Sequence, residues 1–294
     1  MDRREFLKKS MFLTAGAVVG SSFLAKAMPA SADAAASASK KAKEIGLQLY
    51  SLGAKMSDVP GSLKSISEMG YTAAETASYD NGKFYGLAPA EFRKIAEDFG
   101  IRVTGAHLGR PDDPNNKKSV DDWWKQACEA QAAVGGKYIV VPALSFGPTI
   151  KDLDDVCSYF NRTGEIAQSF GLKFGYHNHS HEFEKREGQV IENYLIENTD
   201  PDKVMFELDV YWATKGGVNP SAYIKKYAGR FPLLHIKDDN IIGASQTVDF
   251  EAIFNAAYKC GLEAYYVEIE ANSIPIMECA EKSAEYLSSA KFVK

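Results

Sequence analysis

From Glu44 to the C-terminus, the sequence alternates between short apolar runs rich in β-formers and longer helical patterns. Strands that alternate with helices of this length predict right-handed βαβ units and a parallel sheet. The predicted strands are Ile45–Tyr50, Tyr71–Glu75, Ile101–His107, Tyr138–Val141, Lys173–His179, Val204–Asp209, Leu233–Ile236 and Tyr265–Ile269. The predicted helices are Ser62–Met69, Pro89–Phe99, Val120–Val134, Leu153–Phe170, Ile191–Asn198, Pro220–Tyr227, Phe250–Cys260 and Ile276–Ala290.

Eight strands and eight helices within residues 44–294 predict an α/β fold of the (β/α)8 barrel type, built as a single domain. The main rival is an open, doubly wound sheet, which usually carries a glycine-rich turn after its first strand. Here Gln48 is followed by Leu-Tyr-Ser-Leu-Gly, without a G-x-G-x-x-G pattern. The sequence therefore favours the closed barrel.

Residues 1–34 have the features of an export signal: a basic start, an uncharged apolar segment from Met11 to Ala25, and small-residue cleavage sites. The run from Arg3 and Arg4 to Lys9 resembles the twin-arginine signal. An uncleaved membrane anchor is the alternative, although the apolar segment is shorter than the ~20 residues that span a bilayer. We expect a signal peptide in 1–34, a flexible leader in 35–43, periplasmic localisation and no stable membrane anchor after cleavage.

The chain has a formal net charge of −5, and the predicted signal is itself net basic. Nucleic-acid binding needs clustered lysine and arginine, which the remaining sequence lacks. We therefore expect a small-molecule partner and no nucleic acid. The sequence does not determine the oligomeric state and is compatible with a homo-oligomer.

All five histidines of the chain lie at or just after the C-terminal end of a predicted strand. The active site of a barrel is built on that face, because the loops that follow the strands meet there. A random scatter would rarely place all of them at strand ends. The histidines are His107, His177, His179, His181 and His235.

Carboxylates end several of the same strands, and four consecutive strands each supply one residue of metal-ligand type: His177, Asp209, His235 and Glu268. Two imidazoles and two carboxylates suit Mn, Zn, Co or Fe better than Mg or Ca. Taken singly, each has a structural alternative, such as a helix N-cap for Asp209. Because an unpaired carboxylate in a barrel mouth is costly, the set together predicts one divalent metal ion.

Four segments carry a family resemblance: residues 174–183 (FGYHNHSHEF), 206–212 (FELDVYW), 234–238 (LHIKD) and 267–268 (VE). They resemble strands five to eight of the sugar phosphate isomerase/epimerase family, the xylose isomerase-like barrels. The resemblance implies that Asp209, His235 and Glu268 are metal ligands. The fourth ligand of the family is usually a glutamate on strand five, and this sequence has His177 there.

The departure at His177 affects the chemistry that the resemblance implies. In the epimerases, two glutamates face each other across the substrate as acid and base, and only Glu268 is kept here. Glu268, His179 and Lys237 are therefore the expected catalytic residues, with Glu182 a further substitute for the missing group. Substrate contacts are expected from the other polar and aromatic residues of the strand ends, namely His107, Glu75, Glu182 and Trp212.

The expected function is that of a metal-dependent sugar isomerase or epimerase, in which a base removes the proton next to a carbonyl and an enediolate forms. A lyase or hydratase that acts on 3-keto-glycosides or keto-sugars is the first alternative. A non-catalytic sugar-binding barrel is the second. A metal-free hydrolase with two carboxylates and a DNA-repair barrel are less consistent with this set of residues and with the acidic charge.

Overall fold

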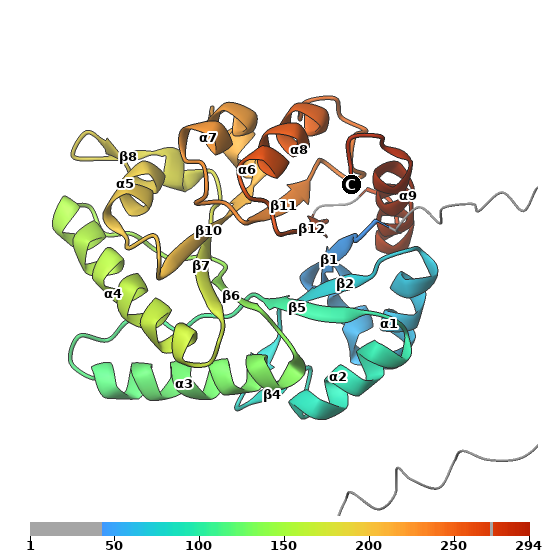
Figure 1. The fold of residues 1–294 in the computed structure, drawn as a ribbon, viewed down its shortest axis with the longest axis horizontal. Coiled ribbons are helices and arrows are strands. Elements are labelled where there is room, and N and C mark those ends of the chain that lie inside the picture. Colours follow the sequence, from blue (N-terminus) through green and yellow to red (C-terminus); the bar gives the residue numbers. More distant parts are fainter. Residues whose placement is uncertain (1–42, 271–272) are drawn as a thin grey trace, which may run out of the picture. The chain divides into compact units, whose positions relative to one another are not determined.

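A computed structural model describes residues 43–270 and 273–294 of the chain. The predicted signal peptide and almost all of the predicted leader lie outside these residues. Within them, the main sheet has eight parallel strands, which lie at the centre of the molecule (Figure 1). They are β1 (Gly46–Gln48), β2 (Ala73–Thr76), β5 (Arg102–Ala106), β6 (Tyr138–Val141), β7 (Lys173–His177), β10 (Val204–Asp209), β11 (Leu233–Lys237) and β12 (Ala264–Glu268).

The sheet curls into a barrel, because each strand pairs in parallel with the next in the order β5-β2-β1-β12-β11-β10-β7-β6. The two outer members of that order, β5 and β6, are joined by a bridge between His107 and Val140. Backbone hydrogen bonds from Leu108 N to Val140 O (3.0 Å) and from Lys137 N to Thr104 O (2.8 Å) complete the joint. The predicted (β/α)8 barrel is confirmed.

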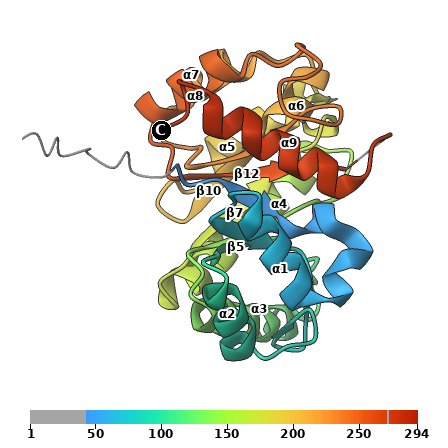
Figure 2. The same ribbon diagram turned by 90° about the vertical axis from the view of Figure 1, so that its right-hand side faces the viewer.

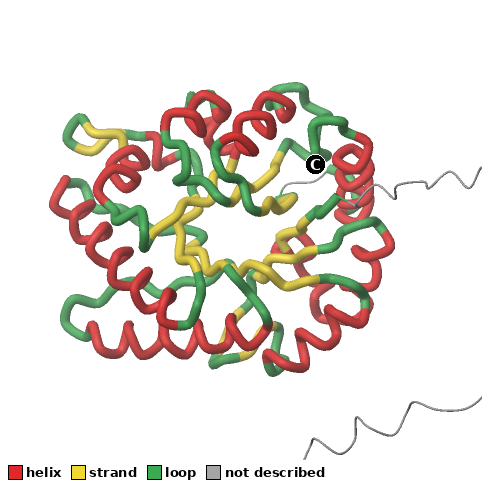
Figure 3. The backbone as a smooth tube through the Cα atoms, viewed as in Figure 1, coloured by secondary structure: helices red, strands yellow, loops and turns green. Residues whose placement is uncertain are grey.

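Helices surround the strands on the outside of the barrel (Figures 2 and 3). All eight predicted helices are present, with ends within a few residues of those expected: α1 (Val59–Glu68), α2 (Pro89–Asp98), α3 (Lys117–Val134), α4 (Ile150–Ser169), α5 (Ile191–Asn198), α7 (Pro220–Lys226), α8 (Phe250–Lys259) and α9 (Ile276–Ser289). No described helix is long and apolar enough to cross a membrane.

Short elements that the sequence analysis did not predict lie in the loops after the strands. They are two 3-10 helices, η1 (Leu49–Ser57) and η2 (His181–Phe183), the α-helix α6 (Val210–Lys215), and two hairpins, β3 (Tyr79–Asp80) with β4 (Lys83–Phe84) and β8 (Lys185–Arg186) with β9 (Gln189–Val190). The helix α6 begins directly after β10 because the Asp209 side chain accepts a hydrogen bond from Trp212 N and caps it.

The barrel interior is apolar in the half that is farther from the carboxyl ends of the strands, which we call its lower part. A cluster of buried inward-facing side chains fills it, from Tyr138, Val140, Met205, Leu233 and Tyr266. A larger core lies between the strands and the surrounding helices and provides most of the apolar burial. Towards the carboxyl ends of the strands the interior becomes polar, and the candidate site lies there.

Candidate metal centre

Strand register sets the depth of each polar side chain in the barrel. Asp209 on β10 pairs with His235 on β11, and Lys237 on β11 pairs with Glu268 on β12. One step lower, Glu207 on β10 pairs with His177 on β7. Because side chains two residues apart on a strand share a face, these pairs form two polar levels inside the barrel.

The upper level, at the mouth of the barrel, contains three of the four residues expected from the sequence to bind metal, and His177 reaches them from the level of Glu207. The structure brings His177, Asp209, His235 and Glu268 together: one ligand atom from each lies within 4.8 Å of all the others. All four residues are buried. His235 Nδ1 is 3.2 Å from Glu268 Oε2. Side chains from four strands thus share a volume of the size of one coordination sphere.

Asp209 gives the clearest test of whether this set fits a metal ion. Its Oδ1 accepts a hydrogen bond of 2.7 Å from Trp212 N, at the start of α6. Its Oδ2 is buried and has no hydrogen-bond partner among the described residues. A buried carboxylate oxygen is costly when it is left unpaired. An orphaned oxygen beside two imidazoles and a second carboxylate fits the donor set of a transition metal.

The lower level also contains His107 and Glu75, which together with Glu207 lie beneath His235. His235 Nε2 is 2.8 Å from Glu75 Oε2 and 3.1 Å from Glu207 Oε2, and His107 Nε2 is 2.6 Å from Glu207 Oε2. Gln48 Nε2 donates to Glu75 Oε2 at 2.8 Å. Glu75 and His107, which we expected to contact substrate, are therefore packed inside the barrel below the mouth.

The sequence analysis selected neither Glu207 nor Gln48 as a site residue. A signal for Glu207 was available, because it lies two residues before Asp209 on the same strand and so faces the same way. Gln48 ends the first strand, but a single amide at a strand end is not specific for a site. Its role depends on the position of Glu75 on the neighbouring strand, with which it is in register.

Lys237 lies at the rim of the mouth and is almost fully buried. Its Nζ is 3.5 Å from Glu268 Oε2 and 2.6 Å from Glu270 Oε2. The same ammonium lies 4.8 Å from the centre of the Trp212 ring. The His179 ring lies 5.9 Å from that ring, so two of the expected catalytic side chains lie around Trp212.

Glu182 is held within the loop that follows β7. Its Oε1 accepts a hydrogen bond from Tyr176 Oη at 2.6 Å, and its Oε2 accepts one from His179 N at 2.8 Å. His181 Nε2 is 3.2 Å from Oε1. Both oxygens of this buried carboxylate are thus engaged with the segment that presents His179. These contacts shape the loop and leave neither oxygen without a protein partner.

The charges of the site follow from its burial. Burial raises the pKa of Asp209 to about 7 and that of Glu207 to about 7. Burial lowers the pKa of His107 to about 4. Burial would also raise the pKa of Glu268, but His235 and Lys237 outweigh that effect and lower it to about 2. Without a cation, the buried carboxyl groups of Asp209 and Glu207 retain protons close to neutral pH.

A cavity of about 350 Å³ opens beside the mouth. Its lining includes Tyr50, Tyr85 and Glu270, the carboxylate that pairs with Lys237. Tyr50 is 60% exposed, and Tyr85 keeps a positive φ of 50°, an unfavourable conformation for a side chain of this size. Aromatic side chains next to convergent polar groups are typical of a small-molecule pocket.

A closed (β/α)8 barrel with a buried cluster of imidazoles and carboxylates at its C-terminal face belongs to a class of barrels whose side chains could hold a metal ion next to a small-molecule pocket. The comparison with known families is consistent with this class. Residues 63–293 match the xylose isomerase-like TIM barrel family, and the chain belongs to that family.

Two solved structures from Parabacteroides distasonis ATCC 8503, both described as sugar phosphate isomerase/epimerase, resemble this chain over most of its length. One is 38% identical with a TM-score of 0.83 and covers 91% of this chain and 100% of its own. The other is 32% identical with a TM-score of 0.81 and covers 86% and 100%. An L-ribulose 3-epimerase structure, at 16% identity, TM-score 0.69 and coverages of 83% and 93%, shares the fold.

A curated relative, the inosose dehydratase of Geobacillus kaustophilus (strain HTA426), is 26% identical over 202 residues. The match covers 60% of this chain and 60% of that enzyme. The chain therefore aligns with somewhat less than two thirds of the length of this relative.

Proposed function

We propose that this protein is a metal-dependent sugar isomerase or epimerase that moves a proton on the carbon next to a carbonyl group. The observation that carries the proposal is the orphaned Oδ2 of Asp209, buried within reach of His177, His235 and Glu268. The family membership and the names of the two Parabacteroides relatives support a carbohydrate substrate.

His177, Asp209, His235 and Glu268 would hold one divalent ion, with Mn, Zn, Co or Fe preferred over Mg or Ca by the mixed nitrogen and oxygen donors. When bound, such an ion supplies electrostatic stabilisation of the negative charge that develops on adjacent oxygens of a hydroxy-carbonyl sugar.

Glu268 is the proposed base, because its carboxylate lies at the mouth of the barrel, 3.2 Å from His235 Nδ1 and 3.5 Å from Lys237 Nζ. Lys237, 3.5 Å from Glu268, is proposed to return the proton or to donate it to a leaving oxygen. The Lys237 ammonium is held by Glu270 and by the face of Trp212, so it cannot swing out of the mouth without losing both contacts. His179, beside Trp212, is the second candidate for this role.

The sugar is proposed to occupy the cavity lined by Tyr50, Tyr85 and Glu270. Tyrosine rings offer an apolar face for the C–H side of a sugar and hydroxyl groups at the edge. Glu182 is proposed to hold the loop that presents His179, since both of its oxygens are already engaged there. The N-terminal twin-arginine pattern supports a periplasmic location for this reaction.

The experiment is solvent-proton exchange. Metal-loaded protein is incubated in deuterated water with a panel of ketoses and 3-keto-glycosides, and the products are followed by NMR. The proposal predicts incorporation of deuterium at the carbon next to the carbonyl, and loss of that incorporation in Glu268→Gln. Tight binding of a sugar without exchange on any panel member would contradict the proposal and favour a non-catalytic sugar-binding barrel.

A lyase or hydratase that acts on keto-sugars is the second candidate. Two observations favour it: His177 replaces the second acid/base glutamate of the epimerases, and the curated relative is named a dehydratase. The same incubation separates the two outcomes. An isomerase returns a product of unchanged mass apart from deuterium, whereas a dehydratase releases water and yields an unsaturated or deoxygenated product.

A further inference from the structure

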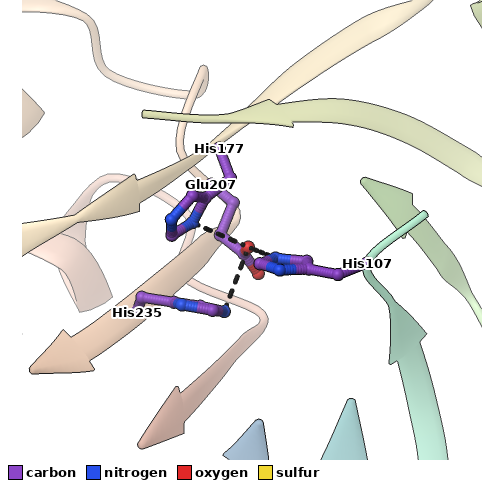
Figure 4. A group of neighbouring side chains, drawn as sticks. All are labelled: His107, His177, Glu207 and His235. Atoms are coloured by element: carbon purple, nitrogen blue, oxygen red, sulfur yellow. Dashed lines mark hydrogen bonds and ion pairs between the residues drawn. The ribbon is translucent and has the colours of Figure 1, made fainter. Parts of the chain in front are cut away.

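Three imidazole nitrogens converge on one carboxylate oxygen below the mouth of the barrel (Figure 4). Glu207 Oε2 lies 2.6 Å from His107 Nε2, 3.1 Å from His235 Nε2 and 3.3 Å from His177 Nδ1. The residues come from the ends of four different strands and are all buried. We call this group, His107, His177, Glu207 and His235, the deep cluster.

Hydrogen bonding alone does not account for the deep cluster. Of the three histidines, only His107 meets hydrogen-bond geometry with Glu207, while His235 Nε2 is directed at Glu75 instead. His177 Nδ1 and Glu207 Oε1 have no hydrogen-bond partner in the described part of the chain. An ionised carboxylate would ordinarily share such donors between its two oxygens. Here Glu207 Oε2 lies close to three imidazole nitrogens, whereas Glu207 Oε1 has no partner among the described residues.

A cation would explain that arrangement. Four ligand atoms at about 2.1 Å from a tetrahedral ion lie about 3.4 Å apart. The separations of His235 Nε2 and His177 Nδ1 from Glu207 Oε2, 3.1 Å and 3.3 Å, are close to that value, and the 2.6 Å of His107 Nε2 is shorter. One donor atom from each residue of the deep cluster lies within 4.8 Å of the others. Glu75 Oε2, 3.2 Å from His107 Nε2, adds a second negative charge, so a divalent ion would be neutralised.

We propose that the deep cluster is a second cation site of the barrel, selective for a nitrogen-preferring divalent metal such as Zn²⁺. The ligands are His107 Nε2, His177 Nδ1, His235 Nε2 and Glu207 Oε2. Three nitrogens and one oxygen favour Zn²⁺ over Mn²⁺ more strongly than the two nitrogens and two carboxylates of the mouth do.

This inference rests on the proposed mouth site, because both sites use His177 and His235. A neutral imidazole has one free lone pair and binds one ion at a time. His235 would serve the mouth through Nδ1, 3.2 Å from Glu268, and the deep cluster through Nε2. The two positions are therefore alternatives. An ion in the deep cluster takes both histidines away from the mouth, so Zn²⁺ bound in the deep cluster would inhibit the reaction that an ion at the mouth supports.

The test compares two variants, each of which is expected to lose the affinity for one metal and to keep the affinity for the other. The affinities of the metal-free full chain for Zn²⁺ and Mn²⁺ are measured by chelator competition. His107→Gln should weaken Zn²⁺ binding by at least about 100-fold, because it removes a direct ligand, and should weaken Mn²⁺ binding by no more than about tenfold, because His107 reaches the mouth only through Glu207 and His235. Asp209→Asn should do the reverse. His181→Gln is the matched control, because this half-buried histidine pairs with Glu182 and belongs to neither site.

Two outcomes overturn the proposal. If Asp209→Asn abolishes Zn²⁺ binding and His107→Gln leaves it intact, both metals bind at the mouth. If His107→Gln weakens both metals equally, His107 only supports the rings through hydrogen bonds. Anomalous diffraction at the zinc edge, on wild-type crystals, decides the position even if a variant fails to fold. Deuterium exchange with Mn²⁺ tests the proposed function separately, because it does not depend on where Zn²⁺ binds.

Discussion

Asp209 uses its two carboxylate oxygens for different purposes. One caps α6 and the other is left free and buried at the mouth of the barrel. From sequence alone, an N-cap and a metal ligand were competing interpretations of this residue. The structure makes the first role visible and leaves an oxygen for the second, so the two interpretations are compatible.

This free oxygen predicts an unusual effect of pH on the metal-free protein. The folded-state pKa of Asp209, about 7, lies above the ordinary value of 3.8, so its contribution to stability is present below about pH 4 and is lost as the pH rises through 7. Asp209→Asn keeps the cap and removes the charge. It should stabilise the metal-free protein by about 1–3 kcal/mol at pH 8 and by little at pH 4.

Urea denaturation at the two pH values measures this effect. Asp239→Asn, at an exposed carboxylate bonded to Tyr211 Oη, is the matched control and should change stability little at either pH. Destabilisation of the metal-free protein by Asp209→Asn at pH 8 would show that the Asp209 carboxylate is well compensated without a cation.

Lys237 provides a prediction that separates chemistry from metal binding. Lys237→Met keeps most of the side-chain volume and the packing against Trp212 but removes the ammonium. Loss of a proton donor should lower kcat by about 10²–10⁴-fold. Mn²⁺ affinity should stay within about threefold of wild type. Steady-state kinetics with calorimetric Mn²⁺ titration checks both numbers, and unchanged turnover would exclude Lys237 from the proton transfer.

At the scale of elements, the order and type of all eight barrel strands and of the eight main helices could be predicted from hydrophobic pattern. The depth of each polar side chain could not, because it depends on strand register. The register between β2 and β5 shifts between Ala74 and Glu75, which places Glu75 opposite Gly105. Local sequence does not encode that shift, and so Glu75 was assigned to the mouth rather than to the level below it.

Gly105 on β5 is the residue that lies opposite Glu75 on β2. A Cβ there would lie 2.5 Å from Glu75 Oε1 and 2.8 Å from Tyr266 Oη. Gly105→Ala should therefore displace Glu75, destabilise the fold by about 1–3 kcal/mol, and weaken metal binding through the His235 ring. Chemical denaturation and metal titration of the same variant measure the two effects.

Gly171→Ala is the control for Gly105→Ala. Gly171 lies in the turn between α4 and β7, whereas His177 is the last residue of β7. The φ of Gly171 is 75°, and a Cβ added there would meet no other atom within 4 Å. Alanine should cost stability there through backbone strain alone. The metal affinity of the Gly171→Ala protein should equal that of wild type. Equal losses of affinity in both glycine variants would contradict a specific link between Gly105 and the site.

At the scale of the whole molecule, the family membership agrees with an enzyme that acts on a small molecule, and the acidic net charge is the reason why we expect no nucleic-acid partner. The N-terminal segment predicts where that enzyme works. Replacing Arg3 and Arg4 together by lysine should abolish export by the twin-arginine route and leave the unprocessed chain in the cytoplasm. Cell fractionation and N-terminal sequencing of the exported form, expected to start after Ala34, check this prediction. Equal export of the double variant would rule that route out.

The position of a bound metal ion tests the central claim most directly. Crystals of the protein loaded with Mn²⁺, measured at the manganese absorption edge, give an anomalous map that locates the ion independently of any assumed mechanism. We predict one peak within about 2.3 Å of Asp209 Oδ2 and of donor atoms of His177, His235 and Glu268. A fully loaded crystal whose only peaks lie outside that group of four side chains would contradict the account.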